Sequence, residues 1–590
     1  MSRFLKNFKD VFIPVAPLVL PTGEVEIVPR NSHMASIPSN QADNKNLKTL
    51  EDIDMETSSG ISENIFDIGN THRKLLNRHI QLIGIGGTIG VALFVAIGTA
   101  LSHGGPLNLF LGFTFWSIPI LMVTATCAEM VCYLPISSPF IRLAGRCVDE
   151  ALETTAGWNF WFLEGSLIPF ELTLFNTLIH YWRDDYSAAI PIAVQVVLYF
   201  LINVFAVKLY GESEFWLAIG KVILAVGLIC FTFITMVGGN PQHDPYGFRY
   251  WRDPGVMNEY IHTGSLGRFQ GFLACVISAC FTIAGPEYVS MVAGEAVNPR
   301  KNLPNAYKQV AYRLTLFFVG GALCVGIVCA YNDPLLLDAI SNSKPGAGSS
   351  PYVIAMTNMH IKVLPHIVNV MLITSSFSAG NSYTYCSSRT LYALALNGKA
   401  PFFFAYCNKN GVPIYAVLAS LCWAMLAFLQ LGETARTVLN WIVNLVTAAQ
   451  LMNFLIICVT YWHFFRACKV QGIDRNSFTF KGWGQPYLSI VAGTLVFIML
   501  WVQGYTVFIP GGWSVTSFLF SYLMIFIDIA IFLFWKVYKR TKYRIPAEVD
   551  LVSGLSEIEE HERIYYAHLE KHGDDPVKWY DRVSAILFGK

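Results

Sequence analysis

Four ionisable side chains stand inside stretches of the sequence that are otherwise apolar enough to cross a lipid bilayer. They are Glu164, Glu171, Lys221 and Glu287. A charge at the centre of a membrane helix costs about 2.5 to 3.5 kcal/mol on insertion scales, so each of these groups needs a compensating partner or a water-filled cavity. Two interpretations follow from the residue types alone. The groups line the path of a solute, or they form internal ion pairs that hold helices together.

The two glutamates of the third apolar stretch, Glu164 and Glu171, are seven residues apart. This is about two helical turns, so both project from one face, and Trp161 is expected near that face. Carboxylates beside an aromatic ring suit an ammonium group, because cation–π contacts contribute about 0.5 to 2 kcal/mol depending on solvation. Phe281 could be a second such ring or an ordinary packing residue. The pattern indicates a small cationic or zwitterionic solute.

Two of the apolar stretches contain residues that interrupt a helix. The first holds several glycines between Gly84 and Gly90, each lowering helix propensity by about 1 kcal/mol relative to Ala. In the second, Pro286 removes a backbone donor and clashes with the preceding turn. Unwound backbone at membrane depth is tolerated only inside protein or beside a cavity, so paired breaks indicate a transporter's substrate site, although glycines also serve close helix packing. The residues expected to line the site at the breaks are Gly86, Gly87, Thr88, Gly90, Phe281, Thr282, Ala284, Gly285 and Glu287.

Membrane helices, which need about 20 apolar residues each, must position these side chains. Nine stretches of about 20 residues contain no Asp, Glu, Lys or Arg, and a tenth, longer stretch is divided into two helices by Pro510. The stretch around Glu164 and Glu171 completes the set. We therefore predict an all-α integral membrane protein with twelve transmembrane helices. The uncharged stretches are residues 80–104, 107–128, 188–207, 222–242, 269–286, 314–332, 365–388, 412–432 and 437–465, with two helices within 485–527 and the acidic stretch at 154–181. The fifth helix is predicted over residues 214–237, so that it includes Lys221, and the sixth continues to Glu287.

The composition agrees with this prediction and excludes several classes of protein. Only 14% of the 590 residues are charged, against about 25% in soluble globular chains, and 54% are hydrophobic. The net charge of +1 offers no basic excess for a nucleic acid, so none is expected as a partner. The sequence contains no cofactor-binding motif, zinc spacing or nucleophile triad. We expect no cofactor, no metal and no enzymatic activity, and we expect an ion gradient to supply the energy.

Basic residues in the loops predict the orientation of the chain. One set of short connections carries about twice as many Lys and Arg residues as the other, and that side also holds the basic residues that flank the first and last helices. Both termini are therefore expected in the cytoplasm. The predicted domains are a largely disordered tail at residues 1–79, a transporter domain at 80–537 and a tail at 538–590, in which residues 557–571 are charged and helix-prone.

The chain from about Arg73 to Phe534 resembles the fungal amino-acid permeases of the amino-acid/polyamine/organocation superfamily. Motifs across all the spans carry the resemblance, among them Asn77-Arg78-His79-Ile80, Gly238-Gly239-Asn240-Pro241, Gly294-Glu295-Ala296-Val297-Asn298-Pro299 and Gly411-Val412-Pro413. Within the family, segments such as His180-Tyr181-Trp182-Arg183 and Phe377-Ser378-Ala379-Gly380-Asn381 are most similar to a plasma-membrane member associated with carnitine and polyamine uptake.

This resemblance implies a LeuT-like fold, proton-coupled uptake and a plasma-membrane location. The two helix breaks lie five helices apart, the spacing of two inverted five-helix repeats, with two further helices at the C-terminal end. The resemblance also places Glu171 close to the cavity, with Glu164 deeper, and makes Asn381 a weaker polar candidate on the eighth helix. Lys221 matches a family lysine at the position where sodium-coupled relatives bind a cation. Burial disfavours its ammonium form, so Lys221 could release and take up a proton.

The chain departs from the family pattern at the first break. Family members usually read Gly-Thr-Gly-Leu-Phe there, and their backbone donors hold the amino acid's carboxylate. This chain reads Gly90-Val91-Ala92-Leu93-Phe94. The hydroxyl of the threonine and one glycine are absent. This difference favours a solute that is recognised mainly by its cationic end, rather than an ordinary α-amino acid.

Two functions remain open from the sequence. The first is a proton symporter that imports carnitine, polyamines or amino acids by alternating access. The second is a nutrient sensor, or transceptor, of the same fold that binds its solute and signals through the cytoplasmic tails. The expected partners are a small cationic or zwitterionic solute, protons, the lipid bilayer and, on the tails, cytoplasmic trafficking proteins.

Overall fold

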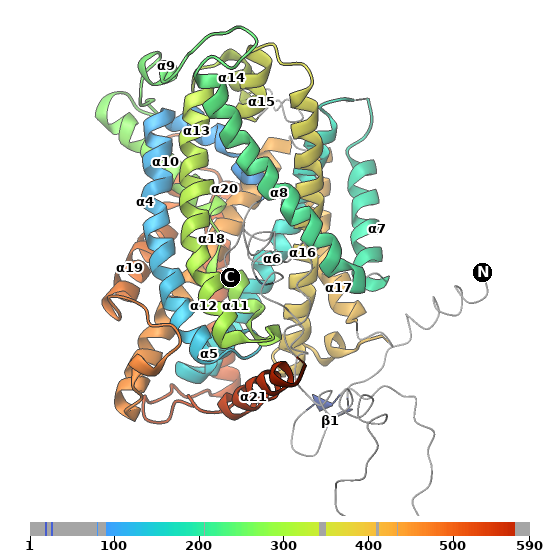
Figure 1. The fold of residues 1–590 in the computed structure, drawn as a ribbon, viewed down its shortest axis with the longest axis vertical. Helices are drawn as coiled ribbons and strands as arrows, with labels where there is room; N and C mark the ends of the chain where they lie inside the picture. The colour runs from blue at the N-terminus through green and yellow to red at the C-terminus, as the bar shows by residue number, and fades with distance from the viewer. Residues whose placement is uncertain are drawn as a thin grey trace, which may run out of the picture.

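The computed structural model describes residue 80 and residues 90–183, 185–205, 207–341, 350–408, 412–432 and 435–572, together with one pair of very short strands. These strands, β1 (Leu18–Val19) and β2 (Val25–Glu26), are antiparallel, with Leu18 opposite Glu26. The rest of the described structure is helical, and its long helices run side by side in a bundle (Figure 1). Apart from these two strands, the predicted disordered tail at residues 1–79 lies outside the described residues.

The first two predicted spans meet in one continuous element. A short 3-10 helix, η1 (Val91–Leu93), is followed by α4 (Ile97–Tyr133), which holds the end of the first span and all of the second. The two parts join at Gly105, whose φ is 77°. A side chain there would also meet Asn258 N at 2.9 Å, so only glycine allows the chain to turn at this close approach.

The next elements bring the acidic third span to the middle of the bundle. After α5 (Pro139–Cys147), the side chain of Asp149 accepts a hydrogen bond from Ala151 N and caps α6 (Glu150–Ile179). Helix α6 packs against α16 (Leu364–Leu396) and α18 (Ala435–Gln471), and most of its apolar length is buried. Between α6 and the sixth predicted span lie α7 (Ala189–Phe205) and α8 (Val207–Met236).

The sixth and seventh predicted spans are each made of several segments. The sixth consists of α10 (Gly264–Thr282) and α11 (Pro286–Met291), separated by three residues. The short 3-10 helix η2 (Ala293–Glu295) leads from α11 to the seventh span. That span runs through α12 (Pro299–Arg313), the six-residue π-helix η3 (Leu314–Val319) and α13 (Gly320–Val328).

The remaining helices complete the bundle and its two ends. Beyond α16 come α17 (Ile414–Leu421), which continues as the 3-10 helix η6 (Cys422–Leu431), then α18, α19 (Tyr487–Val502) and α20 (Val515–Lys539). Three short helices lie at one end of the bundle, and α5 and α21 (Leu555–His572) lie at the opposite end (Figure 1). The three are α9 (Arg249–Arg252), α14 (Pro334–Ser341) and α15 (Pro351–Asn358). The other 3-10 turns are η5 (Phe402–Ala405), η7 (Arg475–Ser477) and η8 (Tyr505–Phe508).

By length and composition, eight helices of the described part can cross a membrane, and α7 and α19 are shorter apolar helices. Large apolar side chains are exposed along the outer faces of several of them, for example Ile190 and Val194 on α7 and Ile223 on α8. Such faces need lipid, because a soluble protein rarely exposes contiguous apolar surface of this extent. The prediction of an all-helical, multi-pass membrane protein is therefore confirmed.

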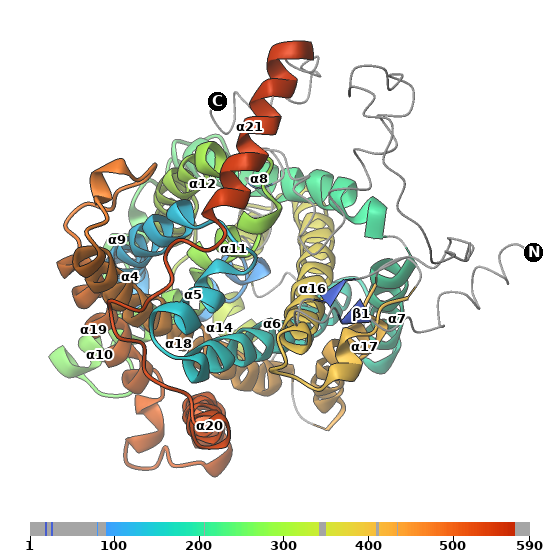
Figure 2. The ribbon, with the colours of Figure 1, turned by 90° about the horizontal axis from the view of Figure 1, so that it is seen from below.

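The segment that follows α20, residues 540–572, crosses the end of the bundle where α5 lies, and we call it the C-terminal strap (Figure 2). Arg544 N donates to Val148 O at 2.8 Å, Gln471 Nε2 donates to Val549 O at 2.8 Å, and Tyr133 Oη donates to Leu551 O at 3.2 Å. The helix-prone stretch within the predicted C-terminal tail is the helix α21, and this part of the tail is packed against the bundle.

Candidate solute site

The break in the sixth span places a carboxylate at the start of a buried helical turn. Helix α10 ends at Thr282, and α11 begins at Pro286, so Glu287 lies in the first turn of α11. Its Oε1 accepts hydrogen bonds from Gly285 N at 3.3 Å and from Gln450 Nε2 of α18 at 2.8 Å. The side chain is fully buried. Glu287 is therefore fixed by its own break and by one neighbouring helix.

Only part of the first break lies within the described residues. Gly86, Gly87 and Thr88 lie outside them. Gly90 has extended backbone (φ −96°, ψ 175°) and leads into η1. A Cβ on Gly90 would stand 3.6 Å from Glu171 Oε1 and 3.9 Å from Tyr383 Oη. The first break is thus in contact with the acidic face of α6.

The two glutamates of α6 are both buried and connect the two breaks. Glu171 lies beside Gly90 and interacts electrostatically with Lys221 of α8, which is also buried. Glu164, two turns away, lies close to Tyr288 and interacts electrostatically with Glu287. The four ionisable residues singled out in the sequence therefore belong to one buried region.

Several carboxylate oxygens in this region have no hydrogen-bond partner among the described residues. They are Glu171 Oε2, Glu287 Oε2 and both oxygens of Glu164. Buried polar atoms are nearly always paired in native proteins, and an unpaired carboxylate is among the costliest exceptions. This cluster is consequently able to accept several hydrogen bonds from a cationic group.

The other residues expected at the sixth-span break lie around this cluster. Phe281 is buried and meets the ring of Phe170 edge to face at 5.0 Å, next to Glu171 in the sequence. Thr282 Oγ1 donates to Ser278 O at 2.7 Å, so its proton is used inside α10. Ala284 is half-buried between the two helical segments. Of these residues, Phe281 alone offers a ring to the acidic region.

Trp161 and Asn381 point elsewhere. Trp161 Nε1 donates to Ser420 Oγ of α17 at 3.4 Å, and its ring packs on Trp423 of η6 at 5.8 Å. Asn381 Oδ1 accepts from Asn203 Nδ2 of α7 at 2.9 Å. A three-residue offset on a helix rotates a side chain by about 60° away from alignment, which turns Trp161 from the glutamate face toward the neighbouring helix.

Sequence reasoning missed three polar contacts of the site. Gln450 holds Glu287, Tyr383 lies beside Gly90, and Tyr288 is next to Glu164. All three are uncharged residues, and neutral polar side chains are common in membrane helices. Their only sequence signal was a polar residue in an apolar run, which does not distinguish a site residue from a packing contact.

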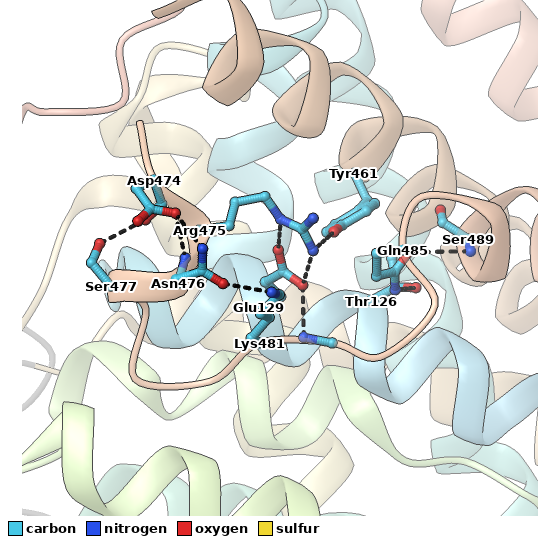
Figure 3. A network of polar contacts seen from close by, with 11 residues as sticks. Thr126, Glu129, Tyr461, Asp474, Arg475, Asn476, Ser477, Lys481, Gln485 and Ser489 are labelled. Atoms are coloured by element: carbon cyan, nitrogen blue, oxygen red, sulfur yellow. Dashed lines mark hydrogen bonds and ion pairs between the residues drawn. The ribbon is translucent and has the colours of Figure 1, made fainter. Parts of the chain in front are cut away.

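A second polar network closes the end of the bundle that carries the C-terminal strap (Figure 3). Arg475 donates to Glu129 of α4 through Nε at 2.6 Å and through Nη2 at 3.0 Å, and Gly482 N donates to the same carboxylate at 2.8 Å. Arg475 Nη2 also donates to Tyr461 Oη of α18 at 3.2 Å. These bonds connect α4 to α18. A separate ion pair between Lys399 and Glu153, both largely buried, connects the residues that follow α16 to α6.

Comparison with known proteins decides what kind of bundle this is. The family model described as amino acid permease matches residues 79–545. The chain belongs to the amino acid permease family. This permease is 58% identical over 501 residues to the general amino acid permease AGP2 of Saccharomyces cerevisiae, with 83% of this chain and 84% of the relative covered.

More distant relatives have narrower names. A proline-specific permease of Emericella nidulans is 37% identical over 523 residues, covering 88% of the permease described here and 94% of the relative. A lysine-specific permease of Saccharomyces cerevisiae is 36% identical over 490 residues, covering 82% and 79%. The permease is thus a multi-pass membrane protein of a transporter family whose solutes are amino acids, and the family part of the predicted resemblance is confirmed.

Proposed function

We propose that this permease is a plasma-membrane secondary active transporter that imports small zwitterionic or cationic solutes by alternating access, coupled to protons. Carnitine, polyamines and amino acids are the proposed solutes. The observation that carries the proposal is the contact of Gly90 with Glu171, in a region where Glu287 of the other helix break is also buried. A solute held there would touch both interrupted spans at once.

The unpaired carboxylate oxygens supply the chemistry of recognition. Keeping Glu164, Glu171 and Glu287 buried costs several kcal/mol for each ionised group that lacks a partner. The ammonium group of a solute would offset that cost through charge-assisted hydrogen bonds. A quaternary ammonium group, which has no N–H donor, would offset it through its charge alone. The aromatic ring of Phe281 adds a cation–π surface at the edge of the cluster.

Lys221 is the proposed coupling group. It is buried and interacts with Glu171, so the protonation of one residue alters the charge that the other experiences. Loss of a proton from Lys221 on one side of the membrane would change how strongly Glu171 holds a cation. This is the linkage that a proton symporter requires.

We further propose twelve transmembrane helices in a 5+5 inverted repeat followed by two helices. The spans are assigned in order to the segment from Ile80 to Gly104, the rest of α4, α6, α7, α8, α10 with α11, α12 with α13, α16, α17 with η6, α18, α19 and α20. Breaks in the first and sixth spans then occupy equivalent positions. The basic residues Lys399, Arg475 and Arg300 stand at the end that carries the C-terminal strap, which supports cytoplasmic termini.

Uptake measurements test the proposal. Labelled carnitine, spermidine, lysine and proline are supplied at two external pH values to cells that lack their own carriers. We expect accumulation of at least one solute, and more of it at the lower pH. If no solute accumulates while binding to isolated membranes persists, the sensor function replaces the transporter.

The proton role of Lys221 is tested in the same cells. Lys221→Met is expected to abolish the dependence of accumulation on external pH while the protein still reaches the cell surface. Accumulation that responds to pH as in the unmodified permease would remove Lys221 from the coupling scheme.

A further inference from the structure

Arg313 is a buried cation that the proposed function has not used. It ends α12, its side chain is 8% exposed, and Nε donates to Gln309 O of its own helix at 3.4 Å. The two terminal nitrogens, Nη1 and Nη2, are buried and have no acceptor among the described residues. A guanidinium carries five N–H donors in a rigid fork, so most of its hydrogen-bonding capacity has no partner in the part of the chain that the structure describes.

Its neighbours on the same helical face touch both helix breaks. Val310, three residues before Arg313, has Cγ1 at 3.7 Å from the position of a Cβ on Gly285 in the sixth-span break. Phe317, four residues after Arg313, lines a small void together with Leu93 and Phe94, which follow Gly90 in the first span. Along the helix, Arg313 lies between these two contacts, about one turn from each.

Other side chains close to Arg313 in the sequence are exposed. Tyr312 is 76% exposed and Leu316 is 51% exposed, whereas Arg313 is 8% exposed. The void beside Phe317 is also lined by Ala225, one turn after Lys221 on α8. The void is therefore bordered by the seventh span and by the turn of α8 that follows Lys221.

The element after Arg313 is also unusual. The chain continues as the π-helix η3, whose wider turn departs from the regular hydrogen-bond pattern. Such π segments are uncommon and occur frequently at functional sites. Arg313 is the residue directly before this π segment.

We propose that Arg313 binds the carboxylate of the solute. A planar guanidinium matches a carboxylate with two parallel hydrogen bonds, and no described residue of the protein occupies that position. The inference rests on the proposed function and narrows it. Solutes with both an ammonium and a carboxylate, such as carnitine and amino acids, use Glu171 or Glu287 at one end and Arg313 at the other. Polyamines, which have no carboxylate, bind without Arg313.

The test compares two solutes in one variant. Arg313→Met is measured for surface level and for uptake of labelled carnitine and spermidine, with Lys308→Met as the control because Lys308 is an exposed cation on the same helix. We expect the KM for carnitine to rise roughly tenfold or more on loss of a charged hydrogen-bonded pair, and the KM for spermidine to change less than about twofold. Lys308→Met should change neither.

Other outcomes overturn the inference. Equal loss of both uptakes at normal surface level would assign Arg313 a general structural role, and no loss of either would show that the carboxylate binds elsewhere. If Arg313→Met does not reach the surface, Arg313→Lys is compared in the same way. Lysine retains the positive charge but cannot form two parallel hydrogen bonds to a carboxylate, so only the uptake of carnitine should fall. An equal fall in the uptake of carnitine and spermidine would reject the role assigned to Arg313.

A binding measurement separates this inference from the proposed function. Carnitine should raise the thermal unfolding temperature of the purified full-length permease, and Arg313→Met should remove that shift. If carnitine raises the unfolding temperature of the unmodified permease but no solute accumulates in cells, the proposed transport function is rejected and the binding role of Arg313 is retained. A shift that persists in Arg313→Met overturns the role of Arg313 alone.

Discussion

Gly90 lies next to Glu171, whose second carboxylate oxygen has no hydrogen-bond partner among the described residues. The 3.6 Å between a Cβ on Gly90 and Glu171 Oε1 is an ordinary van der Waals distance, and the backbone of Gly90 is extended, so alanine fits without strain. The space beside the carboxylate is thus open to a methyl group, and equally to part of a solute.

Gly90→Ala is therefore expected to fold normally and to raise the KM for the solute several-fold, because the methyl group occupies space next to Glu171. Kinetic uptake assays and surface labelling check both parts. Gly380→Ala is the contrasting variant, since its Cβ would stand 2.2 Å from Tyr199 Oη and should reduce the amount of folded protein. An unchanged KM in Gly90→Ala would place the solute away from Glu171.

Glu171→Gln and Glu287→Gln each keep the size of the side chain and remove its charge. Both are expected to lower uptake roughly tenfold or more at normal surface expression, because a charged hydrogen bond contributes about 1.5 to 3 kcal/mol. Glu548→Gln, an exposed carboxylate on the C-terminal strap, is the matched control. Unchanged kinetics in both site variants would reject carboxylate recognition.

Charge inside an apolar run made the acidic residues of the site visible in the sequence. Glu164, Glu171 and Glu287 were found in this way, and all three are buried in one region. The sequence indicated less clearly toward which neighbouring helix a given side chain points. Trp161 is close to Glu164 in sequence, yet it packs on Trp423, because a neighbouring helix decides which side of α6 is the interior.

Among the elements, interruptions with a strong local cause were the easiest to predict. Pro286 cannot continue a helix, and α11 begins at that residue. The π-helix η3 has no comparable signal, since Leu314–Val319 is an ordinary apolar sequence whose register depends on packing against α4. The positive φ of Gly105 was also not foreseen, because it depends on the approach of residue 258 from a distant loop.

The ion pair of Glu129 and Arg475 connects elements that are far apart in sequence, and its energy can be measured. Arg475→Gln leaves the fully buried carboxylate of Glu129 without its cation, which is expected to cost about 3 to 5 kcal/mol of stability. Thermal unfolding of the purified permease checks this.

A double variant completes the cycle for this pair. Because Glu129→Gln removes the buried charge, the combination of Glu129→Gln with Arg475→Gln should be more stable than Arg475→Gln alone. Additive losses would mean that the two side chains do not stabilise each other.

At the scale of the whole molecule, the C-terminal strap joins helices from separate parts of the chain. Arg300 at the start of α12 interacts with Glu559 and Glu562 of α21, and Arg146 of α5 interacts with Asp550. The sequence indicated a charged helix in this tail, but a helix with charges on its surface is equally consistent with solvent. The burial of Leu551 and the hydrogen bonds from α4 and α18 to the strap show that it is docked.

Leu551→Asp is expected to release the strap. Leu551 is fully buried, whereas its neighbour Val552 is 65% exposed, so Val552→Asp is the matched control. In permeabilised cells, limited proteolysis of the strap should be several-fold faster in Leu551→Asp and unchanged in Val552→Asp. Equal rates in all three proteins would contradict the docked arrangement. Cleavage in intact cells would contradict the proposed orientation.

Acidity should not affect this assay near neutral pH. Burial alone would raise the pKa of Asp149, but hydrogen bonds from Lys536, Thr541 and the backbone of Ala151 outweigh it and hold the pKa below its ordinary value. A carboxyl whose pKa is lowered on folding stabilises the fold above its unfolded pKa of about 3.9, and that stabilisation is lost only as the pH falls through the lower folded value. The attachment of α20 to α6 by this group is therefore constant from pH 5 to 8.

Arg300, in the first turn of α12, is held by the strap, and Arg313 ends the same helix one turn after Val310, which lies beside Gly285. One helix thus connects the docked tail to the break in the sixth span. A pull on the tail is therefore expected to displace the end of α12 that carries Arg313, and a solute bound at Arg313 is expected in turn to change how tightly the tail is held.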